Sequence, residues 1–380
     1  MRTPIHLSLE HRQITLRRHP VRQRETHQAW DGADRYMLHH RMKHFLPPLL
    51  VVNDEFGALA IGASHRGEIH HWNDSWVSQY NWRKNAQLND LEATLSHWHW
   101  PLETLPAVGE VWLKVPKTLA LLEYQLQRLT TELPPGTPIY LAWLDKHIPA
   151  RLLELVRAQL QKVELLPGKF KAHGLVGQAK GDGHMPRQAS STFQVPFTET
   201  PLMAHPGVFA QQQLDIGTRF MLEHFPKGQY EHIVDLACGS GVLGLYAAQN
   251  HPKSHLCFAD ESSLAMASAQ ANWQALFPQR EAEFFHGNGL WGWQGQADLI
   301  LLNPPFHQGH TLDTGVAFML FSHAAKKLAP QGEVWVVANQ HLGYEKHLRR
   351  YFRGVALVAR HPKFVLLKAW NSKFSKSHQK

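Results

Sequence analysis

The chain has 380 residues, of which 43% are hydrophobic and 18% charged, with a formal net charge of +8. This composition excludes a disordered chain, and the length favours two domains with separate cores. It contains no apolar run near the ~18 residues of a membrane span, no secretory signal and too few cysteines for a disulfide framework. We therefore expect a cytoplasmic protein. Its basic surface favours a nucleic acid as partner, although solubility alone would also explain the charge.

Apolar strands alternate with helical segments in the N-terminal half. The expected strands there are Leu49–Val52, Val111–Lys114 and Thr137–Trp143. Alternation of this kind implies right-handed crossovers, and it predicts an α/β fold with a mostly parallel, doubly wound sheet.

Residues 181–191 are polar and rich in glycine, which predicts a linker between domains 1–180 and 192–380. The second domain again alternates strands and helices. The expected strands are Ile233–Leu236, His255–Ala259, Glu283–His286, Asp298–Leu302 and Glu333–Ala338, and the expected helices are Val242–Gln249, Leu264–Leu276 and Val316–Leu328.

The two halves show the same order of elements, which predicts a duplicated domain. Lys114 follows a strand of the first half where Asn303 follows a strand of the second. Similar intervals along the chain also match Asp54 with Asp235. The first copy lacks the glycine pair that follows Asp235, so we expect it to have lost the site and to bind or orient a substrate such as RNA.

Polar or glycine-rich residues follow three successive strands of the second domain. Gly239 and Gly241 form a turn after Asp235 that lets a ligand approach backbone N–H groups. Asp260 ends the next strand, where an acidic residue typically binds a ribose diol, and Asn288 follows the third, near an adenine edge. These residues predict an adenosine-type ligand. Because no phosphate-binding P-loop motif occurs, S-adenosylmethionine fits better than a nucleoside triphosphate.

The fourth strand ends in Asn303-Pro304-Pro305-Phe306. The Asn303 side-chain oxygen and the Pro304 carbonyl are acceptors, and the prolines remove two N–H donors. Phe306 adds a ring on which a base can stack. This combination suits a flat group that carries an –NH₂, although a proline-capped strand end would explain the same residues.

Several motifs together resemble one enzyme family, the ribosomal RNA guanine-N2 methyltransferases. They are GVFAQQQLDIGTRF (207–220), DLACGSG (235–241), FADES (258–262) and LLNPPFHQGH (301–310). The segments KVPKTLALLE (114–123), VANQHLGYEKHLRRYF (337–352) and KFVLLKAW (363–370) are closer to the large-subunit branch than to the small-subunit one. The resemblance implies two tandem Rossmann-like class I S-adenosylmethionine-dependent methyltransferase domains from a duplication, of which the C-terminal one is catalytic.

The resemblance further implies methylation of a guanine N2 in 23S ribosomal RNA, and we expect the protein to be a monomer. It makes Asn303, Pro304, Pro305 and Phe306 the catalytic residues, and Phe209, Asp215, Asp235, Ala237, Gly239, Gly241, Asp260 and Asn288 the cofactor-binding residues. Ala237 departs from the family pattern, which usually has glycine there.

Other functions stay open from the sequence. Related NPPF-like tetrads occur in protein glutamine-N5 and DNA adenine-N6 methyltransferases, 16S ribosomal RNA is another possible target, and a non-catalytic RNA-binding protein is a different class. We expect no metal, because the histidines at 70–71 and 97–99 do not have the spacing of a zinc site.

Overall fold

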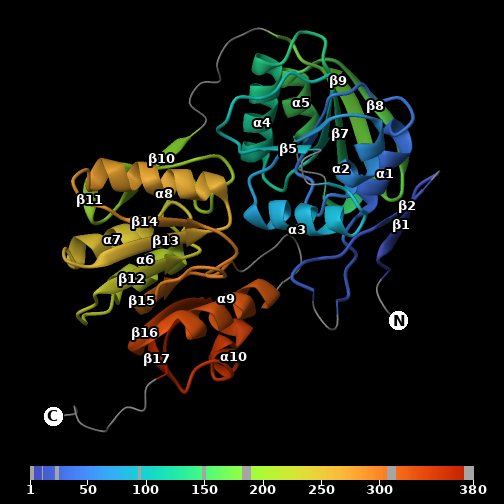
Figure 1. Cartoon of the computed structure of the whole chain (residues 1–380). Coiled ribbons are helices and arrows are strands. Elements are labelled where there is room, and N and C mark those ends of the chain that lie inside the picture. The colour runs from blue at the N-terminus through green and yellow to red at the C-terminus, as the bar shows by residue number, and fades with distance from the viewer. Residues whose placement is uncertain are drawn as a thin grey trace, which may run out of the picture. The chain divides into compact units, whose positions relative to one another are not determined.

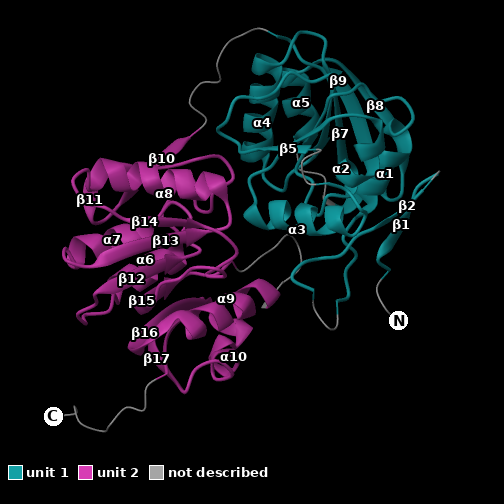
Figure 2. Cartoon of the chain, viewed as in Figure 1, with its two compact units in different colours: residues 1–189 teal, residues 190–380 magenta. Residues whose placement is uncertain are grey.

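The computed structural model describes residues 4–10, 12–21, 25–92, 96–147, 151–181, 190–305 and 314–371. The chain divides into two compact units, residues 1–189 and 190–380 (Figures 1 and 2). Of the predicted linker, residues 182–189 lie outside the described part, and Ser191 already begins a strand. Among the described residues, none of the helices combines the length and hydropathy needed to cross a membrane.

Unit 2 contains a seven-stranded sheet in the order β14-β13-β12-β15-β16-β18-β17. Its strands are β12 (His232–Leu236), β13 (His255–Asp260), β14 (Glu283–His286), β15 (Ala297–Leu302), β16 (Leu328–Asn339), β17 (Gly354–Arg360) and β18 (Phe364–Trp370). The first five in that order pair in parallel, and β18 is antiparallel to both of its neighbours. The four residues 299–302 of β15 are fully buried, as expected of a strand covered on both faces.

The helices of unit 2 cover both faces of this sheet (Figure 1). They are α6 (Ile216–Glu223), α7 (Val242–Asn250), α8 (Ser263–Leu276), α9 (Thr314–Lys327) and α10 (Tyr344–Leu348), with a short 3₁₀ helix η4 (Gln340–Leu342). A hairpin of β10 (Ser191–Val195) and β11 (Thr198–Ala204) packs against α8. Side-chain caps start two of the helices: Asp215 accepts from Thr218 N, and Ser262 accepts from Ala265 N.

Unit 1 repeats this architecture in the order β5-β4-β3-β6-β7-β9-β8. Its strands are β3 (Leu49–Val52), β4 (Ile69–Trp72), β5 (Ser96–His99), β6 (Glu110–Lys114), β7 (Pro138–Leu144), β8 (Gln161–Lys169) and β9 (Ala172–Gln178), with a separate hairpin of β1 (His6–Ser8) and β2 (Gln13–Thr15). Its helices are α1 (Gly32–Arg41), α2 (Ala58–Ala63), α3 (Trp76–Gln87), α4 (Leu119–Glu132) and α5 (Leu152–Gln159), with the 3₁₀ helices η1 (Ser64–Arg66) and η3 (Asp145–His147). Every strand of one sheet has a counterpart in the same place of the other, which confirms the predicted α/β class and duplication.

The duplication extends to individual hydrogen bonds. Gly57 and Gly241 precede α2 and α7 with φ of 83° and 85°. Asn85 and Asn272 donate to the carbonyl of the residue just before that glycine in their own unit, at 2.8 and 2.9 Å. In unit 1 the Asn85 side chain also accepts a backbone N–H from the segment after the β1–β2 hairpin. In unit 2 the Asn272 side chain accepts one from β11, and both distances are 2.8 Å. Such matching detail indicates descent from one ancestral domain.

Strand register tests the residue equivalences expected from the sequence. Lys114 follows the residue of β6 that pairs with the end of β3, and Asn303 follows the residue of β15 that pairs with the end of β12, so that equivalence is confirmed. The match of Asp54 with Asp235 is wrong. Asp54 stands three residues before its αL glycine, as Cys238 does, whereas Asp235 lies within β12. The two carboxylates nevertheless have the same structural role, since each is hydrogen-bonded to backbone N–H at the start of the following helix.

Candidate active site

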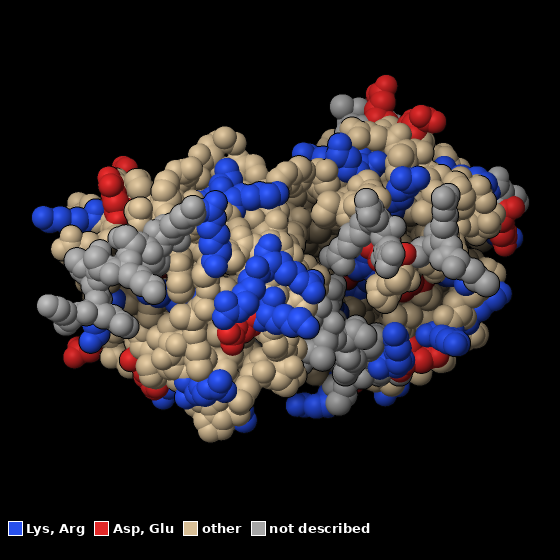
Figure 3. All heavy atoms as spheres, turned by 90° about the horizontal axis from the view of Figure 1, so that it is seen from below, with Lys and Arg blue, Asp and Glu red and all other residues tan. Residues whose placement is uncertain are grey.

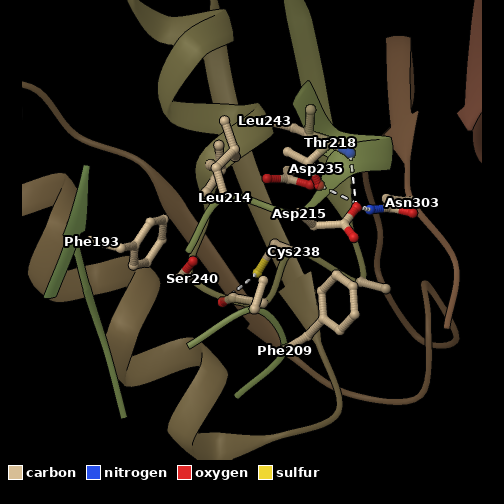
Figure 4. A pocket seen from close by; sticks show the side chains of 14 residues that line it. Phe193, Phe209, Leu214, Asp215, Thr218, Asp235, Cys238, Ser240, Leu243 and Asn303 are labelled. Atoms are coloured by element: carbon tan, nitrogen blue, oxygen red, sulfur yellow. Dashed lines mark hydrogen bonds between the residues drawn. The ribbon is translucent and has the colours of Figure 1, made fainter. Parts of the chain in front are cut away.

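A pocket that opens to solvent lies in unit 2, where β12 and β15 end beside α6 and α7 (Figure 4). The lining residues are Phe193, Phe209, Ala210, Leu214, Asp215, Thr218, Asp235, Ala237, Cys238, Gly239, Ser240, Val242, Leu243 and Asn303. It therefore contains six of the twelve predicted site residues, drawn from three separate motifs.

The turn after β12 forms the floor of this pocket through an unusual backbone. Ala237 and Gly239 have φ of 57° and 55°, in the left-handed region that favours glycine. This conformation suits glycine, the residue that the resemblance implies at the position of Ala237. A Cβ on Gly239 would meet no atom within 4 Å, so that side of the turn faces open space in which a ligand can lie against the backbone.

Asp260 at the end of β13 fixes this turn. Its Oδ2 accepts the N–H of Gly239 at 2.9 Å, and its Oδ1 accepts the N–H of Ser262 at 3.0 Å. Asp260 does not itself line the pocket, but it is hydrogen-bonded to a residue that does.

Gly241 has a different part in the same turn. A Cβ there would lie 3.1 Å from that of Ala269, so glycine allows α7 to start close against α8. Gly241 is not among the lining residues, and its predicted cofactor contact stays a prediction.

Asp235 is the most deeply buried carboxylate of the pocket, with 1% of its surface exposed. Its Oδ2 accepts the N–H of Gly244 at 2.8 Å. Burial raises the pKa of Asp235 to about 8, and the neighbouring Asp260 adds to the increase. Burial also raises the pKa of Cys238 well above its usual value, so that its thiol is neutral and not nucleophilic.

Asn303 lies at the end of β15 with its amide held from one side (Figure 4). Its Nδ2 donates to Asp215 Oδ2 at 3.1 Å and to Thr218 Oγ1 at 2.9 Å. Its Oδ1 is buried and, within the described residues, accepts no hydrogen bond. A buried oxygen without a partner costs ~1–3 kcal/mol, so it is a ready acceptor for a ligand N–H.

The remaining predicted residues lie outside the pocket lining. Pro304 is buried and Pro305 exposed, while Phe306 falls outside the described residues. Asn288 follows β14 and is 8% exposed; its carbonyl accepts the N–H of Trp291. Phe209, which does line the pocket, leaves 57% of its side chain exposed at the opening.

Sequence reasoning missed several lining residues, most of them apolar: Phe193, Leu214, Val242 and Leu243. It also missed Thr218. No local signal marked Thr218: Asp215 is a typical N-cap residue, but the capping-box pattern has Glu or Gln three residues later.

The corresponding place in unit 1 is filled by an ion cluster. Lys114 Nζ lies 2.8 Å from Asp34 Oδ1 and 3.4 Å from Asp31 Oδ2. These carboxylates raise the pKa of Lys114 well above its usual value, against the effect of burial. An ammonium, which has no acceptor, therefore stands in unit 1 where unit 2 has the Asn303 amide.

Comparison with known proteins agrees with this site. A family model described as "Methyltransferase small domain" matches residues 199–368, and one described as "RLMG N-terminal domain" matches residues 4–180. The ribosomal RNA large subunit methyltransferase G of Alcanivorax borkumensis is 39% identical, over 93% of this chain and 94% of the relative. That of Pseudomonas aeruginosa strain PAO1 is also 39% identical, over 94% and 97%.

Among solved structures, a T. thermophilus 16S rRNA N2 methyltransferase, RsmC, in complex with AdoMet and guanosine shares this fold. The match has a TM-score of 0.77 at 19% identity and covers 96% of this chain and 97% of that one. Fold and pocket together define a class I S-adenosylmethionine-dependent methyltransferase built from two related domains. From the relatives and the domain matches, the chain belongs to the ribosomal RNA large subunit methyltransferase G family.

Metal ligands are a separate matter. The part of the chain that the structure describes contains no group of three or more His, Cys, Asp or Glu side chains arranged to hold a metal ion.

Proposed function

We propose that this protein transfers a methyl group from S-adenosylmethionine to the exocyclic N2 of a guanine in 23S ribosomal RNA, in the cytoplasm. The observation that carries the proposal is the buried, unpartnered Oδ1 of Asn303 at a pocket built on a glycine-rich turn. The large-subunit specificity rests on the relatives at 39% identity, whose names specify the large subunit.

The pocket residues fit the methyl donor. The open side of Gly239 offers backbone for the methionine part, and the buried carboxylate of Asp235 suits its ammonium group. The carboxylate of Asp260, which is hydrogen-bonded to the N–H of Gly239, is the acceptor that we assign to the ribose hydroxyls, and Phe209 covers the opening. The donor needs no phosphate site, and its sulfonium supplies the methyl group already activated.

The chain's own task is then to position the amine. The Asn303 Oδ1 accepts one N–H of the target and the Pro304 carbonyl the other, which turns the nitrogen lone pair toward the methyl group. Alignment of this kind is worth effective molarities of ~10⁵ M or more. The nitrogen gains the methyl group as the carbon–sulfur bond breaks, and the proton that it then sheds passes to water. A general base with a shifted pKa is not required.

A basic surface on unit 2 is suited to the RNA backbone. Lys346, Arg349, Arg350 and Arg353 are all exposed on α10 and the turn after it, and Figure 3 shows Lys and Arg side chains gathered on the lower face of unit 2. The helix α10 packs on α9, where the His347 and Phe318 rings stack at 4.3 Å, and α9 follows the Asn303–Phe306 segment in the chain. We propose that phosphates flanking the target base bind this surface.

For unit 1 we propose an RNA-orienting role without chemistry, since Lys114 occupies its counterpart of the Asn303 position. Exposed Lys162 and Lys171 of the β8–β9 hairpin region offer it charge for that role. A target base must leave its stack to reach Asn303, so a loop or flipped nucleotide is the expected substrate.

The experiment is methyl transfer from labelled S-adenosylmethionine to separate preparations of protein-free 23S RNA, 16S RNA and assembled subunits, followed by digestion to nucleosides. We expect N2-methylguanosine from 23S RNA only. Asn303→Ala serves as the control and should abolish the label. Label in 16S RNA, in N6-methyladenosine or in a protein glutamine would each replace the proposed function with a different one.

A further inference from the structure

We propose that Asp215 and Thr218 are positioning residues that lock the Asn303 amide with its oxygen free for the target amine. This inference rests on the proposed function and deepens it. Family resemblance assigned Asp215 only to cofactor binding. The contacts assign it, together with a threonine that no motif singled out, to the residue that holds the target.

The geometry uses both N–H groups of the amide. Asp215 caps α6 through the N–H of Thr218 at 2.9 Å, and the same Oδ2 accepts from Asn303. Thr218 lies one turn into the helix, 7% exposed, with its hydroxyl oxygen on the second N–H. The start of α6 thus presents two acceptors side by side to the end of β15.

The carboxylate fixes which way the amide faces, because it can only accept, whereas the Thr218 hydroxyl adds a second bond to the amide and can accept or donate. If the amide rotated by 180°, its oxygen would face the Asp215 carboxylate, and that hydrogen bond would be lost. The –NH₂ would then point to the target and oppose an incoming amine. With the amide locked, Asn303 presents its oxygen, which together with the Pro304 carbonyl suits a target group that donates two hydrogens.

Unit 1 shows that these three positions change together. Asp31 caps α1 as Asp215 caps α6, and Asp34 stands three residues later, as Thr218 does. The third position is Lys114 in place of Asn303, and there the ammonium bonds to both acids. In unit 1 a cation at the strand end is paired with a second carboxylate at the helix start, and in unit 2 an amide at the strand end is paired with a hydroxyl. The residue at the strand end therefore matches the residues at the helix start in each domain.

The test compares Thr218→Val and Thr218→Ala, which lack the hydroxyl, with Thr218→Ser, which keeps it. Thr200→Val, on the exposed face of β11, is the matched control for the Thr→Val exchange. For each full-length variant we would measure kcat and KM with 23S RNA, the Kd for S-adenosylhomocysteine by calorimetry, and the melting temperature.

We expect Thr218→Val and Thr218→Ala to lower kcat at least tenfold while the S-adenosylhomocysteine Kd stays within twofold of wild type. Thr218→Ser should restore kcat to within about threefold, and Thr200→Val should match wild type. An unchanged kcat in both hydroxyl-free variants overturns the inference, as does a loss of donor affinity as large as the loss of kcat. If wild type methylates a different amine with the same pattern among variants, the proposed substrate fails and the positioning role stands.

Discussion

The buried carboxylate of Asp235 makes a quantitative prediction about donor binding. In the free protein its pKa is about 8, so at neutral pH the carboxyl is mostly protonated. In the proposed binding mode, a bound donor or product places an ammonium group beside Asp235, and this group favours the ionised form. Binding below pH 8 therefore has to expel a proton.

The size of the effect follows from that pKa. Relative to pH 9, the affinity is reduced about twofold at pH 8 and about a hundredfold at pH 6, because each pH unit below the pKa costs nearly tenfold. We therefore expect the affinity for S-adenosylhomocysteine to fall roughly fiftyfold from pH 8 to pH 6. Titration calorimetry in two buffers with different ionisation enthalpies should show close to one proton released per product bound near pH 6, and none with Asp235→Asn.

The unliganded protein gives an independent check of the same group. The folded state retains a proton that an unfolded aspartate loses near pH 4, so Asp235 makes stability fall as pH rises from about 4 to about 8, with no further change above. Asp235→Asn should remove this part of the slope. A product affinity that is flat between pH 6 and pH 8, with no proton release, would refute the reasoning.

Three further perturbations have defined outcomes. Lys114→Met leaves the two carboxylates of unit 1 without their cation and should cost about 3–5 kcal/mol in its thermal unfolding, with donor affinity unchanged; an unaltered transition contradicts this. Gly244→Ala places a Cβ against the ring of Phe258, so the urea midpoint of unit 2 should fall by the equivalent of ~1–3 kcal/mol, and a wild-type midpoint would show that the packing is loose. Arg350→Gln should lower the slope of log RNA affinity against log salt by about 0.7–0.9, whereas an equal slope would place the RNA elsewhere.

Much of the fold could be predicted because its parallel strands are covered on both faces. Apolar runs such as Asp298–Leu302, bounded by polar residues, stand out in the sequence, and β15 spans Ala297–Leu302. The exposed elements could not be predicted in this way. β8 and β17 lie at sheet edges with few buried side chains, and the β10–β11 hairpin begins within the stretch predicted as a linker. Their strands form because a neighbour supplies hydrogen bonds, which no local pattern records.

The site was predictable where its chemistry lies within one segment. The glycine turn and the Asn303 motif were recognisable because each carries its function in a few adjacent residues. The partners of Asn303 were not, since Thr218 and Asp215 lie 85 and 88 residues away along the chain. Likewise, similar spacing suggested that Asp54 matches Asp235, but a carboxylate can reach the start of the next helix from either of two nearby positions.

The most direct test of the central claim is mass mapping of ribosomal RNA from cells that lack this protein, complemented with either wild type or Asn303→Ala. The account predicts that one N2-methylguanosine disappears from 23S RNA, that wild type restores it, and that the Asn303 variant does not. An unchanged 23S RNA in the deletion cells, or full restoration by the variant, would contradict it.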